Sequence, residues 1–307
     1  GKTGMAEILM KAGSFIAIII LGYVLRRRGF FKEEDFYVLS RIVLKITLPA
    51  AIVTNFTGID MKPSMLLMSL LGLGGGIILT GMAFLISAGK NGEEKAFNII
   101  NLTGYNIGNF TMPFAQSFLG PLGVVATSLF DSGNALVCLG GTYSVAVMAK
   151  GEKGKFSIMP IIKTLLSSVP FDAYLLMTVL SLLHLSLPAP MVSFTGIIAN
   201  GNAFMAMLML GVGFKMTLDK SRMGKIIQIL FIRYSVSIAL AAAFYFLLPF
   251  ELEYRQALAI LALSPIASAA PAFTGDLDGD IGLASAVNSI SIVISIVLIT
   301  GTLLLVL

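Results

Sequence analysis

Two stretches of an otherwise apolar sequence combine amide and hydroxyl side chains with helix-breaking residues. The first, residues 98–113, ends at Pro113, and the second, residues 263–275, contains Pro271. Proline lacks the backbone N–H and clashes with the preceding turn, so each stretch leaves carbonyl groups without a helical partner. Such groups are costly in hydrocarbon unless protein or water covers them. We therefore predict a central polar site whose substrate-binding residues are Asn106, Asn109, Thr111, Pro113, Ser268 and Pro271.

The chemistry expected at these breaks is the binding of a small anion. The N-terminal end of a half-helix carries a partial positive charge, which attracts anionic groups. The competing interpretation is a pair of simple proline kinks, with polar side chains that bond across neighbouring helices. Asn, Thr and Gly residues gather beside the proline of the first stretch, and this clustering favours the site.

Asp131 is the second candidate, because a charge inside a membrane segment is costly and by default functional. Asn134 follows one helical turn later on the same face. Asp131 either binds a proton or cation that couples transport, or bonds to freed N–H groups at the break and holds it together. Hard cations prefer oxygen ligands. The residues predicted for ion coupling are Asp131, Asn134, Asn288 and Ser291.

For most of the other ionisable residues within apolar segments, we favour a structural role over a role in binding. The basic residues expected to extend to the membrane interface are Arg41, Lys45, Lys163 and Arg233. Asp172 is either a second titrating group or a partner for a basic residue. His184, the only histidine, is expected at the outer interface, with a role as a pH sensor as the alternative.

The composition requires lipid as the solvent for these segments. Of the 307 residues, 57% are hydrophobic and 12% are charged, whereas a soluble domain has about 25% charged residues. The single cysteine, Cys138, excludes an internal disulfide. The net charge of +5 does not indicate nucleic acid as a partner, because the basic residues lie between apolar runs and set the topology. The lipid bilayer is the expected environment.

Ten segments are long and apolar enough to be transmembrane helices, so the fold class is an all-α integral membrane protein. They span residues 7–25, 36–56, 65–88, 95–119, 122–148, 160–185, 189–214, 225–248, 255–275 and 281–306. Lys and Arg concentrate in the loops after odd-numbered spans, while the loops after even-numbered spans hold only Lys62 and Arg255. The positive-inside rule therefore predicts cytoplasmic odd loops and both termini outside, in a cell membrane that we expect to be a prokaryotic inner membrane.

Five spans in each half predict an inverted repeat, since an odd number of spans turns the second half over. The halves are residues 5–149 and 150–307, and residues 1–4 before Met5 have the character of a cloning remnant. Pro113 precedes Gly123 in the first half much as Pro271 precedes Gly282 in the second. Pro and Gly are common in membrane helices, so the span count and charge pattern are the stronger arguments.

Short motifs, in their order along nearly the whole chain, resemble the auxin efflux carrier family. They are Thr47-Leu48-Pro49-Ala50, Asn106-Ile107-Gly108, Met112-Pro113-Phe114, Gly120, Gly123, Phe130-Asp131 with Asn134, and Gly279-Asp280 with Ala284-Ser285. The resemblance implies the fold of bile-acid:sodium symporters, with spans four and nine as crossed, broken helices and elevator-type alternating access. Spans one, two, six and seven would form the scaffold, and spans three to five and eight to ten the transport core.

The resemblance also implies an organic anion as substrate, with Asn106 near the crossing and Pro113 and Pro271 at the breaks. Asn109 and Thr111 make span four more polar than the usual family pattern, and the loop at 149–157 is shorter than in many plant members. These departures leave the substrate's identity open.

Enzymatic functions find little support. One His and one Cys are too few ligands for the metal ion of a hydrolase. Asp131 lacks a clear second carboxylate of the kind that an aspartyl protease needs. The sequence also has no phosphate-binding loop for a nucleotide. We therefore predict a non-enzymatic secondary active transporter of a small organic carboxylate, without a cofactor but with Na⁺ or H⁺ as an optional coupling ion. The alternatives are a sodium- or proton-coupled symporter or antiporter of another small solute, and a non-transporting membrane sensor. A homodimer through the scaffold helices is also expected.

Overall fold

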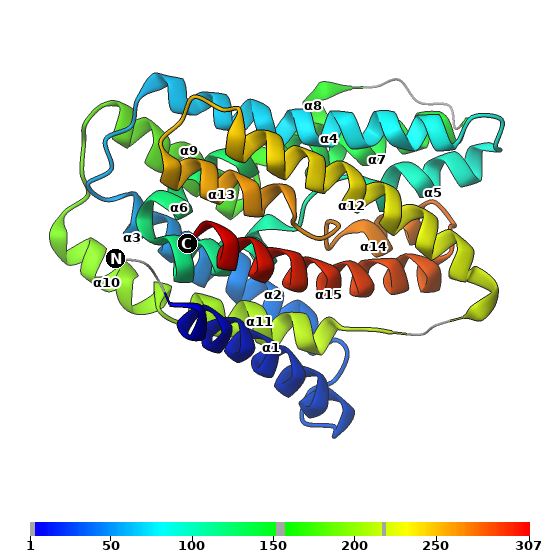
Figure 1. Ribbon diagram of the computed structural model, residues 1–307, viewed down its shortest axis with the longest axis horizontal. Helices are drawn as coiled ribbons and strands as arrows, with labels where there is room; N and C mark the ends of the chain where they lie inside the picture. The colour runs from blue at the N-terminus through cyan, green and yellow to red at the C-terminus, as the bar shows by residue number, and fades with distance from the viewer. Residues whose placement is uncertain (1–3, 152–156, 217–218) are drawn as a thin grey trace.

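The computed structural model describes residues 4–151, 157–216 and 219–307, and throughout these residues the regular structure is helical, with no strand (Figure 1). Most of the predicted cloning remnant, with Lys2, lies outside the described residues, and so do Lys153 and Lys155 of the predicted charge pattern. The all-helical prediction is confirmed.

Seven helical segments in the described residues are long and apolar enough to cross a membrane, and an eighth is gained if one bent pair is a single span. The seven are Met5–Arg27, Asp35–Phe56, Pro63–Ile86, Gly92–Ala149, Ala189–Gly213, Lys220–Phe246 and Ile281–Val306. The bent pair is α8 (Ile158–Leu166) with α9 (Val169–Leu182), at 80°. These apolar helices are those of a multi-pass membrane protein.

Most of these segments are composites of shorter helices. Within the first half, α1 (Met5–Arg27) precedes α2 (Asp35–Ile42), a π-helical turn η1 (Val43–Thr47), α3 (Leu48–Phe56), a short η2 (Pro63–Leu66) and α4 (Leu67–Ile86). Within the second half, α10 (Ala189–Ala199) and α11 (Asn202–Gly213) precede η5 (Lys220–Arg222), α12 (Met223–Phe246) and α15 (Ile281–Val306).

The segment Gly92–Ala149 has 58 residues, far more than the ~20 that one crossing needs. It consists of α5 (Gly92–Leu102), a non-helical break at 103–106, η3 (Ile107–Thr111), α6 (Met112–Leu136), η4 (Val137–Gly141) and α7 (Thr142–Ala149). Inside α6 the backbone departs from helical geometry at Gly120, with φ 65°. This positive φ suits glycine, and it allows the chain to change direction there.

A second break separates α13 (Leu252–Ala262) from α14 (Ala270–Asp276), so both predicted interruptions are present. Their positions differ from the prediction, because Pro113 and Pro271 lie in the first turns of α6 and α14. Proline is tolerated in a first turn, where its missing N–H has no helical partner to lose. The proline that lies within the second break is Pro265.

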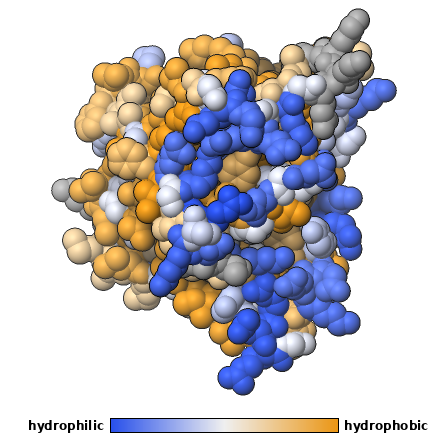
Figure 2. Space-filling model, turned by 90° about the vertical axis from the view of Figure 1, so that its right-hand side faces the viewer, coloured by the Kyte–Doolittle hydropathy of each residue, from blue (hydrophilic) through white to orange (hydrophobic). Residues whose placement is uncertain are grey.

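The connecting residues 28–34, 87–91, 214–216, 219–222 and 277–280 gather at one end of the molecule, opposite the half that holds both termini (Figure 1). Hydrophilic residues form a broad band across this end, beside a hydrophobic flank (Figure 2). Ion pairs join the loops and helix ends there: Lys215 with Glu33 at 3.6 Å, Lys225 with Glu94 at 3.3 Å, and Arg222 with Asp280. We call this surface the polar end. The Asp280 side chain also accepts from the Leu283 N–H, so Asp280 caps the N-terminus of α15.

Helix pairs pack closely through glycine. α4 crosses α6 where Gly72 faces Phe130 and Gly133 faces Ser69, and α1 crosses α11 through Gly22 and Gly211. A Cβ atom on Gly133 would overlap the Ser69 carbonyl, and a Cβ on Gly72 would overlap that of Phe130. The backbones thus touch directly, as expected for helices that associate through van der Waals contact in lipid.

Candidate functional site

The two breaks touch each other in the interior. The Asn106 N–H donates to the Pro265 carbonyl at 2.9 Å, so the first break supplies the donor for a carbonyl group of the second break. The hydroxyls of Thr111 and Ser264 lie 2.5 Å apart beside this contact. Residues separated by more than 150 positions therefore meet where the two helices are interrupted, and we call this contact the crossing.

Asn134, in the C-terminal part of α6, replaces the missing helical bonds of the first break. Its Oδ1 accepts from the Tyr105 N–H at 3.1 Å, and its Nδ2 donates to the Tyr105 carbonyl at 2.8 Å. The same Nδ2 donates to Asp131 Oδ1 at 3.0 Å. The other Asp131 oxygen accepts from the Tyr174 hydroxyl of α9 at 2.6 Å. Asp131 is thus held by one residue of its own helix and one of a neighbouring helix.

Residues of α15 support the second break in a similar way. Ser291 Oγ accepts from the Ile266 N–H at 3.2 Å, Asn288 Nδ2 donates to the Ala267 carbonyl at 2.9 Å, and Ser295 Oγ donates to the Leu263 carbonyl at 2.7 Å. Each break therefore has a helix beside it whose polar side chains bond to its backbone, which is what an interrupted helix inside lipid requires.

Arg233 is a residue of this crossing that the sequence reasoning missed. The prediction that it reaches the interface is wrong, since its side chain is 0% exposed. Its guanidinium donates to three backbone carbonyl groups, those of Leu102 at 2.9 Å, Ser264 at 3.0 Å and Pro265 at 3.1 Å. It also lies 4.6 Å from the centre of the Tyr105 ring. A central position in a long apolar helix was the available signal.

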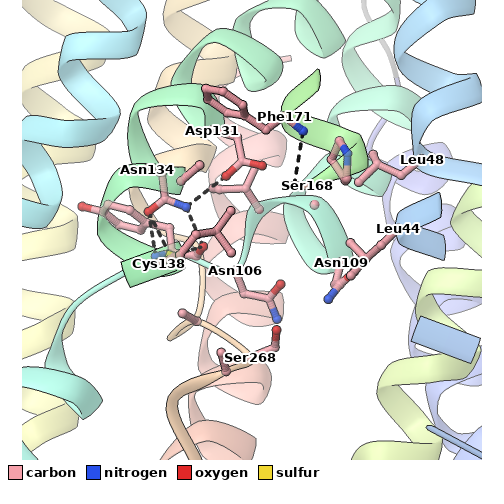
Figure 3. Close-up of a pocket in the computed structure, with 18 of the residues that line it drawn as sticks. Leu44, Leu48, Asn106, Asn109, Asp131, Asn134, Cys138, Ser168, Phe171 and Ser268 are labelled. Atoms are coloured by element: carbon pink, nitrogen blue, oxygen red, sulfur yellow. Dashed lines mark hydrogen bonds between the residues drawn. The ribbon is translucent and has the colours of Figure 1, made fainter. Parts of the chain in front are cut away.

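A cavity of about 160 Å³ lies beside the first break (Figure 3). Its polar lining comes from both breaks, from α6 and from α9: Asn106, Asn109, Asp131, Asn134, Ser168, Tyr174 and Ser268. Its apolar wall includes Leu44 and Leu48 of the η1–α3 segment and Phe171 of α9. We call it the inner cavity.

A larger cavity of about 620 Å³ adjoins the inner cavity on the side of the polar end. Glu33, Glu34 and Lys215 of the polar end line it, together with Pro271 and Asn288. We call it the vestibule. Both cavities share Leu44, Asn106, Asn109, Ser268 and Ala269, so these residues lie at the boundary between them. Figure 3 shows Asn106 and Asn109 pointing into the same space, with Ser268 nearby.

A third cavity, of about 450 Å³, lies between α4, α6 and α9. Leu129, Ser132 and Tyr174 contribute to its wall, and Pro63 and Leu66 at the start of the third span mark its far side from the polar end. Tyr174 thus borders both this cavity and the inner cavity.

Two amide atoms at the boundary have no hydrogen-bond partner among the residues that the structure describes. They are Asn106 Nδ2 and Asn109 Oδ1, whose residues are only 4% and 7% exposed. Asn106 also precedes η3 without capping it through its side chain. A buried polar atom without a partner is costly, so at a cavity such an atom is available to a water molecule or to a polar group of a ligand.

The structure divides the predicted site residues into groups. Asn106, Asn109 and Ser268 meet at the boundary of the two cavities, and Pro271 lines the vestibule. Thr111 and Pro113 are buried and line neither cavity.

The predicted ion-coupling residues do not share one cavity. Asp131 and Asn134 line the inner cavity, Asn288 lines the vestibule, and Ser291 is fully buried. Asp172 and His184 are exposed on the surface of α9 and just after it. In the described part of the chain, no group of three or more His, Cys, Asp or Glu residues has the geometry to hold a metal ion.

Comparison with known proteins adds no assignment. The chain matches no protein-family model, and no curated protein matches its sequence.

Proposed function

We propose that the protein is a secondary carrier of a small organic anion, with the substrate bound where the two interrupted helices cross. The observation that carries this proposal is the pair of unpaired, buried amides of Asn106 and Asn109 at the boundary of two cavities. A carboxylate accepts and an associated water donates hydrogen bonds, so a hydrated organic anion would satisfy both amides.

The sign of the ligand charge follows from the helix that begins at the site. The first N–H groups of a helix lack internal partners and carry a partial positive charge. Ile107, Gly108 and Asn109 open the segment η3–α6 and line the inner cavity. The unpaired Asn106 Nδ2 is a further donor beside them. The volume of about 160 Å³ favours a substrate of few carbon atoms.

The course of the chain supports ten passages through the bilayer. The long Gly92–Ala149 segment contributes two passages because it changes direction at Gly120, and α13 with α14 contributes one. The bent pair α8–α9 contributes another. An inverted repeat of residues 5–149 and 150–307 then relates the two breaks, and places both termini on the side away from the polar end.

Packing supports a division into scaffold and transport core. α1 packs on α11, and α3 packs on α10 and α9, whereas α4 packs on α6 and α12 on α13. The crossing belongs to the second group. In an elevator mechanism this group would move against the scaffold, and the vestibule would be the open route toward the cytoplasm. The loop charges favour that orientation, and a homodimer through the scaffold would hold it fixed.

Replacing the boundary amides is the direct test of the substrate site. We expect Asn106→Ala and Asn109→Leu each to lower transport of a small carboxylate about tenfold or more, because each loses a hydrogen bond to a charged ligand. Counterflow of labelled carboxylates in proteoliposomes measures this, with membrane insertion checked by the yield of monodisperse protein.

Asn200→Ala is the matched control, because Asn200 is exposed at the end of α10 and lines none of the three cavities. Unchanged kinetics in both site variants would remove the crossing from consideration as the substrate site. A protein that moves no solute, with neither saturation nor counterflow, would support the membrane-sensor alternative.

Coupling to a proton is the second candidate property, and Asp131 is the observation that favours it. Its carboxyl group lines the inner cavity and accepts hydrogen bonds from Tyr174 and Asn134. We expect Asp131→Asn to abolish any dependence of uptake on pH while protein yield is preserved. Uptake measured across a pH gradient decides this, and pH dependence that persists in the variant would assign Asp131 a structural role.

A further inference from the structure

The crossing brings together helix ends of opposite electrostatic character. α5 ends at Leu102 and α13 ends at Ala262, and the carbonyls at such ends carry partial negative charge. The segment that begins at Ile107 presents the opposite, positive end. A crossing of this kind can therefore attract a cation at one place and an anion at another, and the side chains around it decide which is used.

The guanidinium group of Arg233 binds the negative C-terminal ends of α5 and α13. Arg233 donates to Leu102, the last residue of α5, and to Ser264 and Pro265, just beyond α13, at 2.9 to 3.1 Å. These three carbonyls are oxygen atoms of the kind that coordinate sodium. With Arg233 bonded to them, they are not free for an ion. Arginine stays charged even when buried, so the position holds a permanent positive charge.

The charge of Arg233 has no acidic partner in the part of the chain that the structure describes. Its hydrogen-bond partners there are carbonyl groups, and the face of the Tyr105 ring lies 4.6 Å away. Arg233 lines neither the inner cavity nor the vestibule. It therefore acts on the cavity through the two breaks, whose backbone it joins, rather than by touching a ligand.

We propose that Arg233 takes the place of a bound cation at the crossing, so that the site selects an anion and does not require sodium at the helix ends. This inference deepens the proposed carrier function, and its anion half rests on that function. Arg233 neutralises the negative ends, and the positive end at Ile107 and the unpaired Asn106 Nδ2 then dominate the inner cavity. Arg233 is a positioning residue in this arrangement.

The sodium test needs no knowledge of the substrate. The thermal unfolding midpoint of the purified full chain is measured in sodium chloride and in choline chloride of equal ionic strength. We expect the same midpoint in both salts for the unchanged protein and for Arg233→Lys, which keeps the charge. We expect sodium to raise the midpoint of Arg233→Gln, whose carbonyls become open to the ion.

Arg255→Gln is the matched control. Arg255 also donates to two carbonyls, those of Phe250 and Tyr245, and lies 5.7 Å from the Tyr245 ring, but it is remote from the crossing. Its variant is expected to lose stability without gaining a response to sodium. A sodium response of the unchanged protein, or an Arg233→Gln variant that ignores sodium, would overturn the inference.

The anion test uses succinate and benzoate as probes, with succinamide and benzamide as neutral counterparts. We expect a carboxylate, and not its amide, to raise the midpoint equally in both salts. Its apparent affinity should fall about tenfold or more in Arg233→Gln, and less in Arg233→Lys. A requirement for sodium in the unchanged protein would contradict the inference, as would equal affinity in the Gln variant.

The two proposals fail in different ways. If no carboxylate stabilises or is transported by the unchanged protein in either salt, the carrier proposal fails while the sodium comparison still tests Arg233. If Arg233→Gln does not yield folded protein, the Arg233→Lys variant decides: indifference to sodium with retained carboxylate binding supports the inference, and a new need for sodium overturns it.

Discussion

Gly72→Ala is expected to prevent the accumulation of folded protein. The added Cβ would overlap the carbonyl oxygen of Phe130, on the backbone of α6, and no side chain can move aside to make room. Overpacking against side chains costs about 1–3 kcal/mol, and separating two backbones also displaces Asp131 and Asn134 in the next turn. The yield of monodisperse protein and its thermal unfolding midpoint measure the effect.

Gly74→Ala is the matched control on the same helix, because no atom lies within 4 Å of its added Cβ. That variant should equal or exceed the unchanged protein in stability, since alanine is the better helix former. Similar behaviour of the two variants would show that α4 and α6 do not approach each other as closely as described.

Asn134→Leu is expected to abolish transport and to destabilise the crossing. Leucine leaves the N–H and the carbonyl of Tyr105 without partners and removes a donor to Asp131. Each buried group left unsatisfied costs about 1–3 kcal/mol, so two of them and a carboxylate together approach the whole stability of a typical domain. Counterflow activity and the unfolding midpoint both report the loss.

Asn134→Asp gives the informative comparison. Aspartate keeps an acceptor for the Tyr105 N–H but loses the donor that served the Tyr105 carbonyl and Asp131. We expect it to be as damaging as leucine, because two carboxylates then lie side by side. Normal activity of either variant would mean that the first break is supported by other groups.

The sequence allowed the helical class, the two interruptions and the polar residues of the first break to be predicted. Hydropathy identifies apolar segments without any knowledge of packing, and clustered Asn, Thr and Gly residues mark a stretch that cannot be an ordinary apolar helix. The exact positions of the breaks could not be predicted from the sequence. Pro113 and Pro271 proved compatible with first turns, and the chain opens instead at 103–106 and around Pro265.

The role of Arg233 could not be read from the sequence, because its partners are backbone carbonyls of two distant segments. A carbonyl has no sequence signature. The same limit applies to the pairing of Asp131 with Tyr174, which joins residues of two helices that only the fold brings together. Ser291, predicted as an ion ligand, is instead engaged by the Ile266 N–H and donates to the Asn288 carbonyl.

The short contact between Tyr174 and Asp131 has a consequence for turnover. Under the elevator proposal, Tyr174 belongs to the scaffold and Asp131 to the transport core. Each movement of the core past the scaffold must therefore first break this contact. A hydrogen bond to a charged group is worth about 1.5–3 kcal/mol, which corresponds to roughly a ten- to hundredfold slower departure from the resting position. Under this proposal the bond holds the transport core in the state that is open toward the polar end. Substrate binding, or protonation of the Asp131 carboxyl group, would weaken the bond and release the core.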